Sequence, residues 1–75
     1  MTADDHERRG LAKIGAELAA AVHRDDGAKA IAICDRLRSV GFTYPRIVAL
    51  MQGAAPGLDE GELDACIREG EAGGA

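Results

Sequence analysis

The 75-residue sequence predicts an all-α fold, a single domain of four helices in which the third helix is short. Two observations predict this fold class. Apolar residues recur at the three- and four-residue intervals of helices, whereas no segment alternates with the two-residue period of a strand. Stretches rich in glycine, proline or aspartate interrupt the pattern at residues 25–27, 41–45 and 53–57, which divides it into four segments. The chain is too short for a second domain, and we expect residues 1–4 and 70–75 to form disordered tails.

The first helix is expected over residues 5–24, where acidic residues at its start suit the positive end of the helix dipole. Its apolar stripe consists of Leu11, Ile14, Leu18 and Val22. A second face carries small side chains, namely Ala12, Ala16, Ala19 and Ala20. Because alanines let another helix approach closely, and because so small a domain gains stability from a partner subunit, we expect a homodimer through this helix.

The second helix is expected over residues 28–40, directly after the sequence Asp-Asp-Gly at 25–27. An aspartate at this point can cap the helix, and Gly27 is expected to let the chain turn. The buried stripe is expected to consist of Ala30, Ile33, Cys34, Leu37 and Val40. Gly41 then supplies the left-handed residue that commonly ends a helix.

The stretch GFTYPRIVALMQG, residues 41–53, contains the start of the third helix. Thr43 is a preferred N-cap residue, and Pro45 falls in the first turn, where its missing N–H costs no hydrogen bond. Phe42 precedes the cap and is spaced to pack on Ile47. The core-facing residues are expected to be Ile47, Val48, Leu50 and Met51.

The fourth helix is expected from Asp59 to residue 69 or 71. Asp59 and Glu62 have the spacing of a capping box, and Leu58 is placed to pack on Leu63. The apolar face is expected to consist of Leu63, Cys66 and Ile67.

The residues that usually carry catalysis or bind metals are sparse. Cys34 and Cys66 both fall within apolar helical patterns, so we expect two buried thiols. With His6 and His23 they have no recognisable metal-ligand spacing, and the sequence contains no nucleotide-binding or hydrolase motif. A catalytic pocket is also difficult to build in so short a chain. We therefore expect a protein that is not an enzyme and that has no cofactor.

The stretch at 41–53 resembles the first helix and turn of helix-turn-helix regulators, through Gly41, Tyr44, Ala49 and Gly53. It departs from that pattern because the interval between Tyr44 and Ala49 is one residue too long. The segment AAPGLD also makes the turn longer than a compact motif allows. A small DNA-associated regulator with a degenerate motif over residues 41–70 is accordingly the alternative interpretation. Its candidate nucleic-acid contacts are Arg36, Arg38 and Arg46.

Charge favours a protein partner over DNA. The formal charge of −4 lies in the C-terminal third, because residues 58–71 contain six acids and one base, whereas acids and bases cancel in residues 1–40. Such a segment repels the phosphate backbone. The candidate partner-binding residues are Asp59, Glu60, Glu62, Asp64 and Glu69. An acidic surface of this kind would dock on the basic patch of another protein.

These patterns favour a small protein-binding module, an adaptor or an inhibitor of the kind that phages and mobile elements encode. A subunit that functions only as an oligomer is a further possibility within the same composition. Neither a targeting segment nor an apolar run of membrane-spanning length is visible, so we expect a cytoplasmic protein without a membrane partner.

Overall fold

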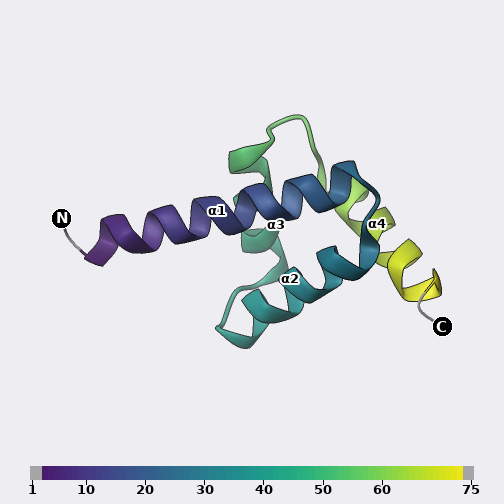
Figure 1. Cartoon of the computed structure of the whole chain (residues 1–75), viewed down its shortest axis with the longest axis horizontal. Coiled ribbons are helices and arrows are strands. Elements are labelled where there is room, and N and C mark those ends of the chain that lie inside the picture. The colour runs from purple at the N-terminus through teal and green to yellow at the C-terminus, as the bar shows by residue number, and fades with distance from the viewer. Residues whose placement is uncertain (1–2, 74–75) are drawn as a thin grey trace.

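The computed structural model describes residues 3–73, which form four α-helices: α1 (Ala3–His23), α2 (Gly27–Ser39), α3 (Tyr44–Ala54) and α4 (Glu60–Gly73) (Figure 1). The predicted all-α fold with a short third helix is confirmed. Residues 3–4 and 70–73, which we expected in disordered tails, are helical, so both terminal helices are longer than predicted. The other tail residues, 1–2 and 74–75, lie outside the described part of the chain.

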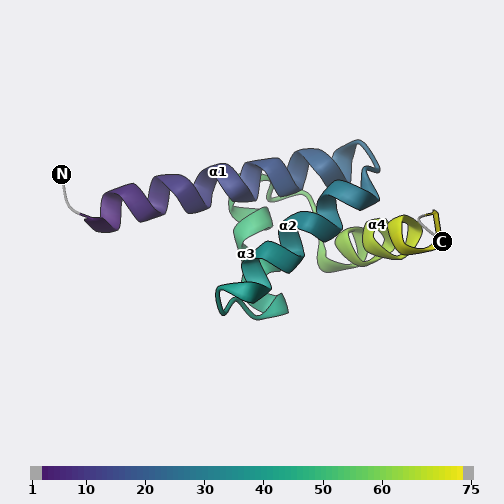
Figure 2. The same cartoon turned by 60° about the horizontal axis from the view of Figure 1, so that its bottom comes forward.

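The long helix α1 runs along the longest dimension of the molecule, whose extents are 44 × 26 × 18 Å. It packs mainly on α3 and also on α2, while α2 packs mainly on α4. In both views the N-terminal half of α1 projects beyond the other helices (Figures 1 and 2). The remaining half of α1 and the other three helices enclose the core.

The core lies where α1, α2, α3 and α4 meet. Its largest fully buried side chains are Leu18, Leu37, Ile47, Met51 and Leu63, all of which the apolar patterns predicted. Two predictions at the edge of the core are wrong. Val40 is 69% exposed, because α2 ends at Ser39 and the chain turns away from the core there. Ala19 is buried in the core and does not belong to the exposed alanine face.

Two glycines allow helices to pack at very short distances. A Cβ atom on Gly15 would lie 2.5 Å from the Leu50 carbonyl oxygen, and a Cβ on Gly27 would lie 2.4 Å from the Gly70 Cα. Gly27 is therefore required for the contact between α2 and α4, and our expectation that it makes the turn is wrong. Asp25, with φ 54°, supplies the left-handed conformation in that turn. The predicted left-handed cap at Gly41 is confirmed, with φ 101°.

The helix starts follow the predicted caps in two of three cases. The Asp26 carboxylate accepts a hydrogen bond from the Lys29 backbone N–H at 3.2 Å, and Asp59 accepts one from Glu62 N–H at 2.9 Å. Thr43 occupies the N-cap position of α3 with extended backbone, but its side chain makes no cap hydrogen bond, so that part of the prediction is wrong. Pro45 in the first turn sets the start of this helix instead.

None of the described helices combines the length and the apolarity that crossing a membrane requires.

Candidate functional site

The two halves of α1 differ in how far their apolar residues are covered. Leu18 and Val22 are buried, whereas Leu11 and Ile14, on the same stripe, are only half-buried. The difference arises because the N-terminal half passes beyond the ends of α2 and α3. We refer to residues 3–14 as the open half of α1 and to residues 15–23 as the closed half. The open half leaves an apolar groove on each of its two sides.

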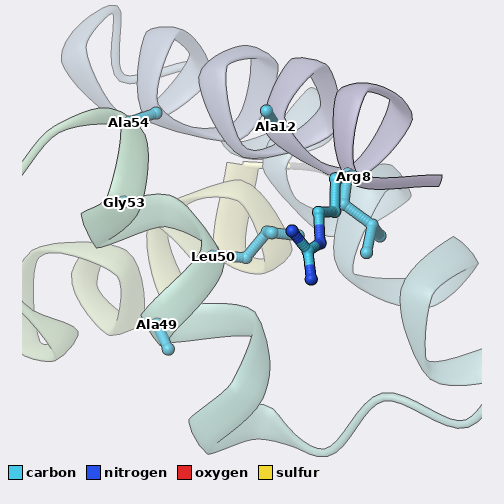
Figure 3. Close-up of a pocket in the computed structure, with 7 residues that line it drawn as sticks. Arg8, Ala12, Ala49, Leu50, Gly53 and Ala54 are labelled. Atoms are coloured by element: carbon cyan, nitrogen blue, oxygen red, sulfur yellow. The ribbon is translucent and has the colours of Figure 1, made fainter. Parts of the chain in front are cut away.

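The first groove, which we name the α1–α3 groove, lies between the open half of α1 and the C-terminal half of α3. It has a volume of about 370 Å³. Its lining consists of Arg8, Leu11, Ala12, Ala49, Leu50, Gly53 and Ala54. Arg8 and Leu50 project into the space between the two helices (Figure 3). The small residues at the end of α3 keep the groove open, and apolar atoms form most of its surface.

The second groove, named the Glu7–Arg46 groove, lies on the other side of the open half and faces the connection between α2 and α3. It has a volume of about 480 Å³. Its lining consists of Glu7, Gly10, Leu11, Ile14, Val40, Phe42 and Arg46. The Arg46 guanidinium lies 4.7 Å from the centroid of the Phe42 ring. At this distance a cation is attracted to the face of an aromatic ring. Leu11 lines both grooves, so a single side chain links them.

The structure does not bring the five predicted acidic residues onto one face. Glu60 and Asp64 are one helical turn apart on the side of α4 that lies near Tyr44, whereas Glu62 and Glu69, seven residues apart, share another side. Asp59 uses its carboxylate as a helix cap.

Asp64 is half-buried and accepts a hydrogen bond from the Tyr44 hydroxyl. Burial and the Asp64 carboxylate raise the pKa of Tyr44 above its ordinary value, since both disfavour the phenolate. This contact joins α3 to α4. Asp64 therefore has a structural role that the charge pattern of the sequence did not reveal.

The tight contact between Gly27 and Gly70 creates an acidic cluster that the sequence did not predict. It brings the turn containing Asp25 and Asp26 close to Glu69 on α4. The pKa of the Cys66 thiol is raised mainly by burial, and the charges of Asp25, Glu69 and Asp26 raise it further. The sequence would predict that these acids lie close together only if the contact between Gly27 and Gly70 were known.

Of the three candidate nucleic-acid contacts, the structure places Arg38 and Arg46 on different aromatic rings. The Arg38 guanidinium lies 5.7 Å from the centroid of the Tyr44 ring, while Arg46 lies over Phe42. Arg36 is two residues from Arg38 on α2 and therefore points to another side of the helix. Arg38 and Arg46 are thus each held against a separate ring of the α2–α3 region.

The segment that resembles a helix-turn-helix forms α3, followed by a connection over residues 55–59. This connection is longer than the three or four residues of a compact motif. In addition, α4 packs mainly on α2 instead of forming a compact pair with α3. The arrangement of α3 and α4 therefore differs from that of the motif.

Both cysteines are buried and free, as predicted. Burial is the main cause that raises the pKa of Cys34 and of Cys66, so both thiols stay protonated near neutral pH. Their position in the core is that of small apolar side chains. Within residues 3–73, no group of three or more histidine, cysteine, aspartate and glutamate side chains is placed to hold a metal ion.

Comparison of the chain with protein-family models, with curated proteins and with solved structures finds no match in any of the three. The protein is therefore described by its own fold and by its two grooves. The molecule is a small all-α domain in which one helix extends beyond the core and carries an apolar groove on each side.

Proposed function

We propose that this protein is a non-enzymatic protein-binding module, an adaptor or an inhibitor, and that its binding surface is the pair of grooves beside the open half of α1. The half-burial of Leu11 is the observation that carries the proposal. Leu11 continues the stripe that forms the core at Leu18, and it lines both grooves. Contiguous apolar surface, such as two adjoining grooves lined by several apolar side chains, is typical of surfaces that bind another protein.

The grooves suit an amphipathic segment of a partner. Such a segment would place its apolar side chains against Leu11 and Leu50 in the α1–α3 groove, in the manner of a helix bound in a groove. Arg8 at the edge of this groove offers a guanidinium that can donate two parallel hydrogen bonds to a carboxylate. This charge would orient the partner and speed the encounter more than it would raise affinity.

Site-specific photocrosslinking tests the proposal. A photoreactive phenylalanine at the exposed Ala49 position, which lines the α1–α3 groove, should crosslink a partner in lysate of the source organism. The substitution Leu11→Glu should abolish that crosslink, because it introduces a charge into the apolar lining. Lys13→Glu is the matched control, since Lys13 is exposed on the same helix but lines neither groove. A crosslink that survives Leu11→Glu, or no crosslink at all, would refute the proposal.

A second candidate surface is the acidic cluster of Asp25, Asp26 and Glu69, which would bind the basic patch of a partner. The observation that favours it is the approach of the α1–α2 turn to α4 at Gly27 and Gly70, which concentrates negative charge from two elements. A photoreactive residue at the exposed Ala65 on α4 reports on this end of the molecule. Crosslinks from Ala65 that are weakened by Glu69→Lys and by added salt would favour the acidic cluster over the grooves.

A further inference from the structure

We infer that the Glu7–Arg46 groove binds a second copy of this chain, so that the protein forms a homodimer with two-fold symmetry. This inference rests on the proposed function, because it names the partner of one of the two grooves. It places the interface on a different side of α1 from the alanine face that the sequence suggested.

The first argument is charge self-complementarity. In a two-fold symmetric interface, residue i of one copy meets residue j of the other and the reverse contact forms as well. The Glu7–Arg46 groove carries one acid on α1 and one base on α3, and both side chains are exposed. In the dimer, Glu7 of each copy therefore meets Arg46 of the other copy. Two opposite charges at the edge of one apolar lining fit a second copy of the same surface.

The second argument is steric. A Cβ atom on Gly10 would have no other atom within 4 Å, so the groove side of α1 is open at this residue. The missing side chain lets a second helix approach the backbone of α1 closely. Val40 is 69% exposed, which is unusual for a large aliphatic residue, and it lies in the same lining as Leu11 and Phe42. A second copy would cover all of these groups.

The third argument is area. A stable interface buries about 1,200 Å² in total at the low end, which is about 600 Å² from each copy. This is roughly 12% of the 4965 Å² accessible surface of the chain. The open half of α1 projects beyond the other helices, so a second copy can pack along it as well as in the groove. Dimerisation would also add apolar burial to a domain whose size limits its own core.

The experiment uses charge reversal and mixing, with mass measured by analytical ultracentrifugation over a concentration series. Wild type should be a dimer at high micromolar concentration. Glu7→Arg places two arginines at each contact, and Arg46→Glu places two glutamates there, so each variant alone should be a monomer. When the two variants are mixed, both contacts pair Arg with Glu, so the mixture should regain a dimer that contains one copy of each.

The mixing step separates an interface from a contact within one chain. If Glu7 and Arg46 acted only inside the monomer, the double variant would recover but the mixture would not, and the inference would be overturned. Wild type that keeps the 7.8 kDa monomer mass throughout the series would overturn it as well. Val40→Ser should weaken the dimer at least tenfold, because Val40 is covered only in the dimer.

Ala16→Glu distinguishes the two sides of α1. Ala16 is exposed on the alanine face and does not line the Glu7–Arg46 groove, so this variant should dimerise like wild type. A monomeric Ala16→Glu variant would place the interface on the alanine face and overturn the inference. Crosslinking from Ala49 in the other groove does not involve Glu7 or Arg46. Failure of the homodimer would therefore leave the proposed function to be judged by its own test.

Discussion

The open and closed halves of α1 have the same apolar periodicity but different surroundings. In the closed half, Leu18 is fully buried and Gly15 packs directly against the backbone of α3. In the open half, Leu11 is half-buried and Gly10 faces open space. The comparison teaches that a continuous apolar stripe does not measure the length of a core. Where the stripe continues past the neighbouring helices, its residues stay partly exposed, and we propose that they bind a partner.

The largest single loss of stability in this comparison is expected from removing a leucine side chain. Leu18→Ala should lower the free energy of unfolding by about 3 kcal/mol, because it leaves a cavity in the core. Leu11→Ala should lower it by about 1 kcal/mol, because its side chain already contacts solvent. Urea denaturation followed by circular dichroism measures both values. Equal losses would show that the open half belongs to the core.

The two glycines should respond to alanine with opposite signs. Gly15→Ala should destabilise the protein by about 2 kcal/mol, because the new methyl group would overlap the Leu50 carbonyl and force α1 away from α3. In the monomer, Gly10→Ala should raise stability by roughly 0.5–1 kcal/mol, because alanine favours the helix and the added methyl group meets no atom of the same chain. Thermal melts of the two variants, at an equal concentration low enough that the protein is monomeric, test this. Destabilisation by Gly10→Ala would contradict the open space found beside it.

Smaller effects are expected from two contacts made by the aromatic rings of Tyr44 and Phe42. Tyr44→Phe removes the hydrogen bond to Asp64 and should cost about 1 kcal/mol. Arg46→Ala, next to the open half, removes an exposed cation from the Phe42 ring and should cost about 0.5 kcal/mol.

Tyr44→Phe also has a signature in the pH dependence of stability. Because the folded state raises the pKa of Tyr44, it keeps the phenolic proton at a pH where the unfolded chain has lost it. The stability from this proton is full below the ordinary tyrosine pKa of about 10 and is lost as pH rises above it. Tyr44→Phe should therefore flatten the decline in stability above pH 10. An unchanged alkaline decline in the variant would show that Tyr44 is not its source.

Small effects of a similar size are expected at the helix caps. Asp59→Ala should cost about 1 kcal/mol, because it removes a hydrogen bond to the Glu62 N–H. Thr43→Ala should cost only about 0.3 kcal/mol, because the Thr43 side chain makes no cap hydrogen bond. Denaturation of the two variants in parallel provides the measurement. A loss near 1 kcal/mol for Thr43→Ala would show that its hydroxyl caps α3 in solution.

Local chemistry predicted much of this fold. Periodicity located the core residues, and Asp26, Gly41 and Asp59 marked helix ends because their roles depend only on neighbouring backbone. The exposure of Val40 and the burial of Ala19 depend on where the other helices end, which the stripe does not contain.

The candidate sites were harder to predict, because they form between segments distant in sequence. The acids of α4 look like one surface when they are counted along the chain, but the helix distributes them over two sides, and Tyr44 binds Asp64. The two grooves depend on how far α1 extends past α3 and on the absence of a side chain at Gly10. No pattern within one helix predicts these properties.

One comparison tests the central claim most directly: the stability and the binding of Leu11→Glu, measured on the same preparation. We predict that the free energy of unfolding stays within about 1 kcal/mol of wild type, since Leu11 lies outside the closed core. The dimer mass and the Ala49 crosslink should both be lost, since Leu11 lines both grooves. A loss of stability close to that of Leu18→Ala, or binding equal to that of wild type, would contradict the claim that the open half of α1 is a binding surface.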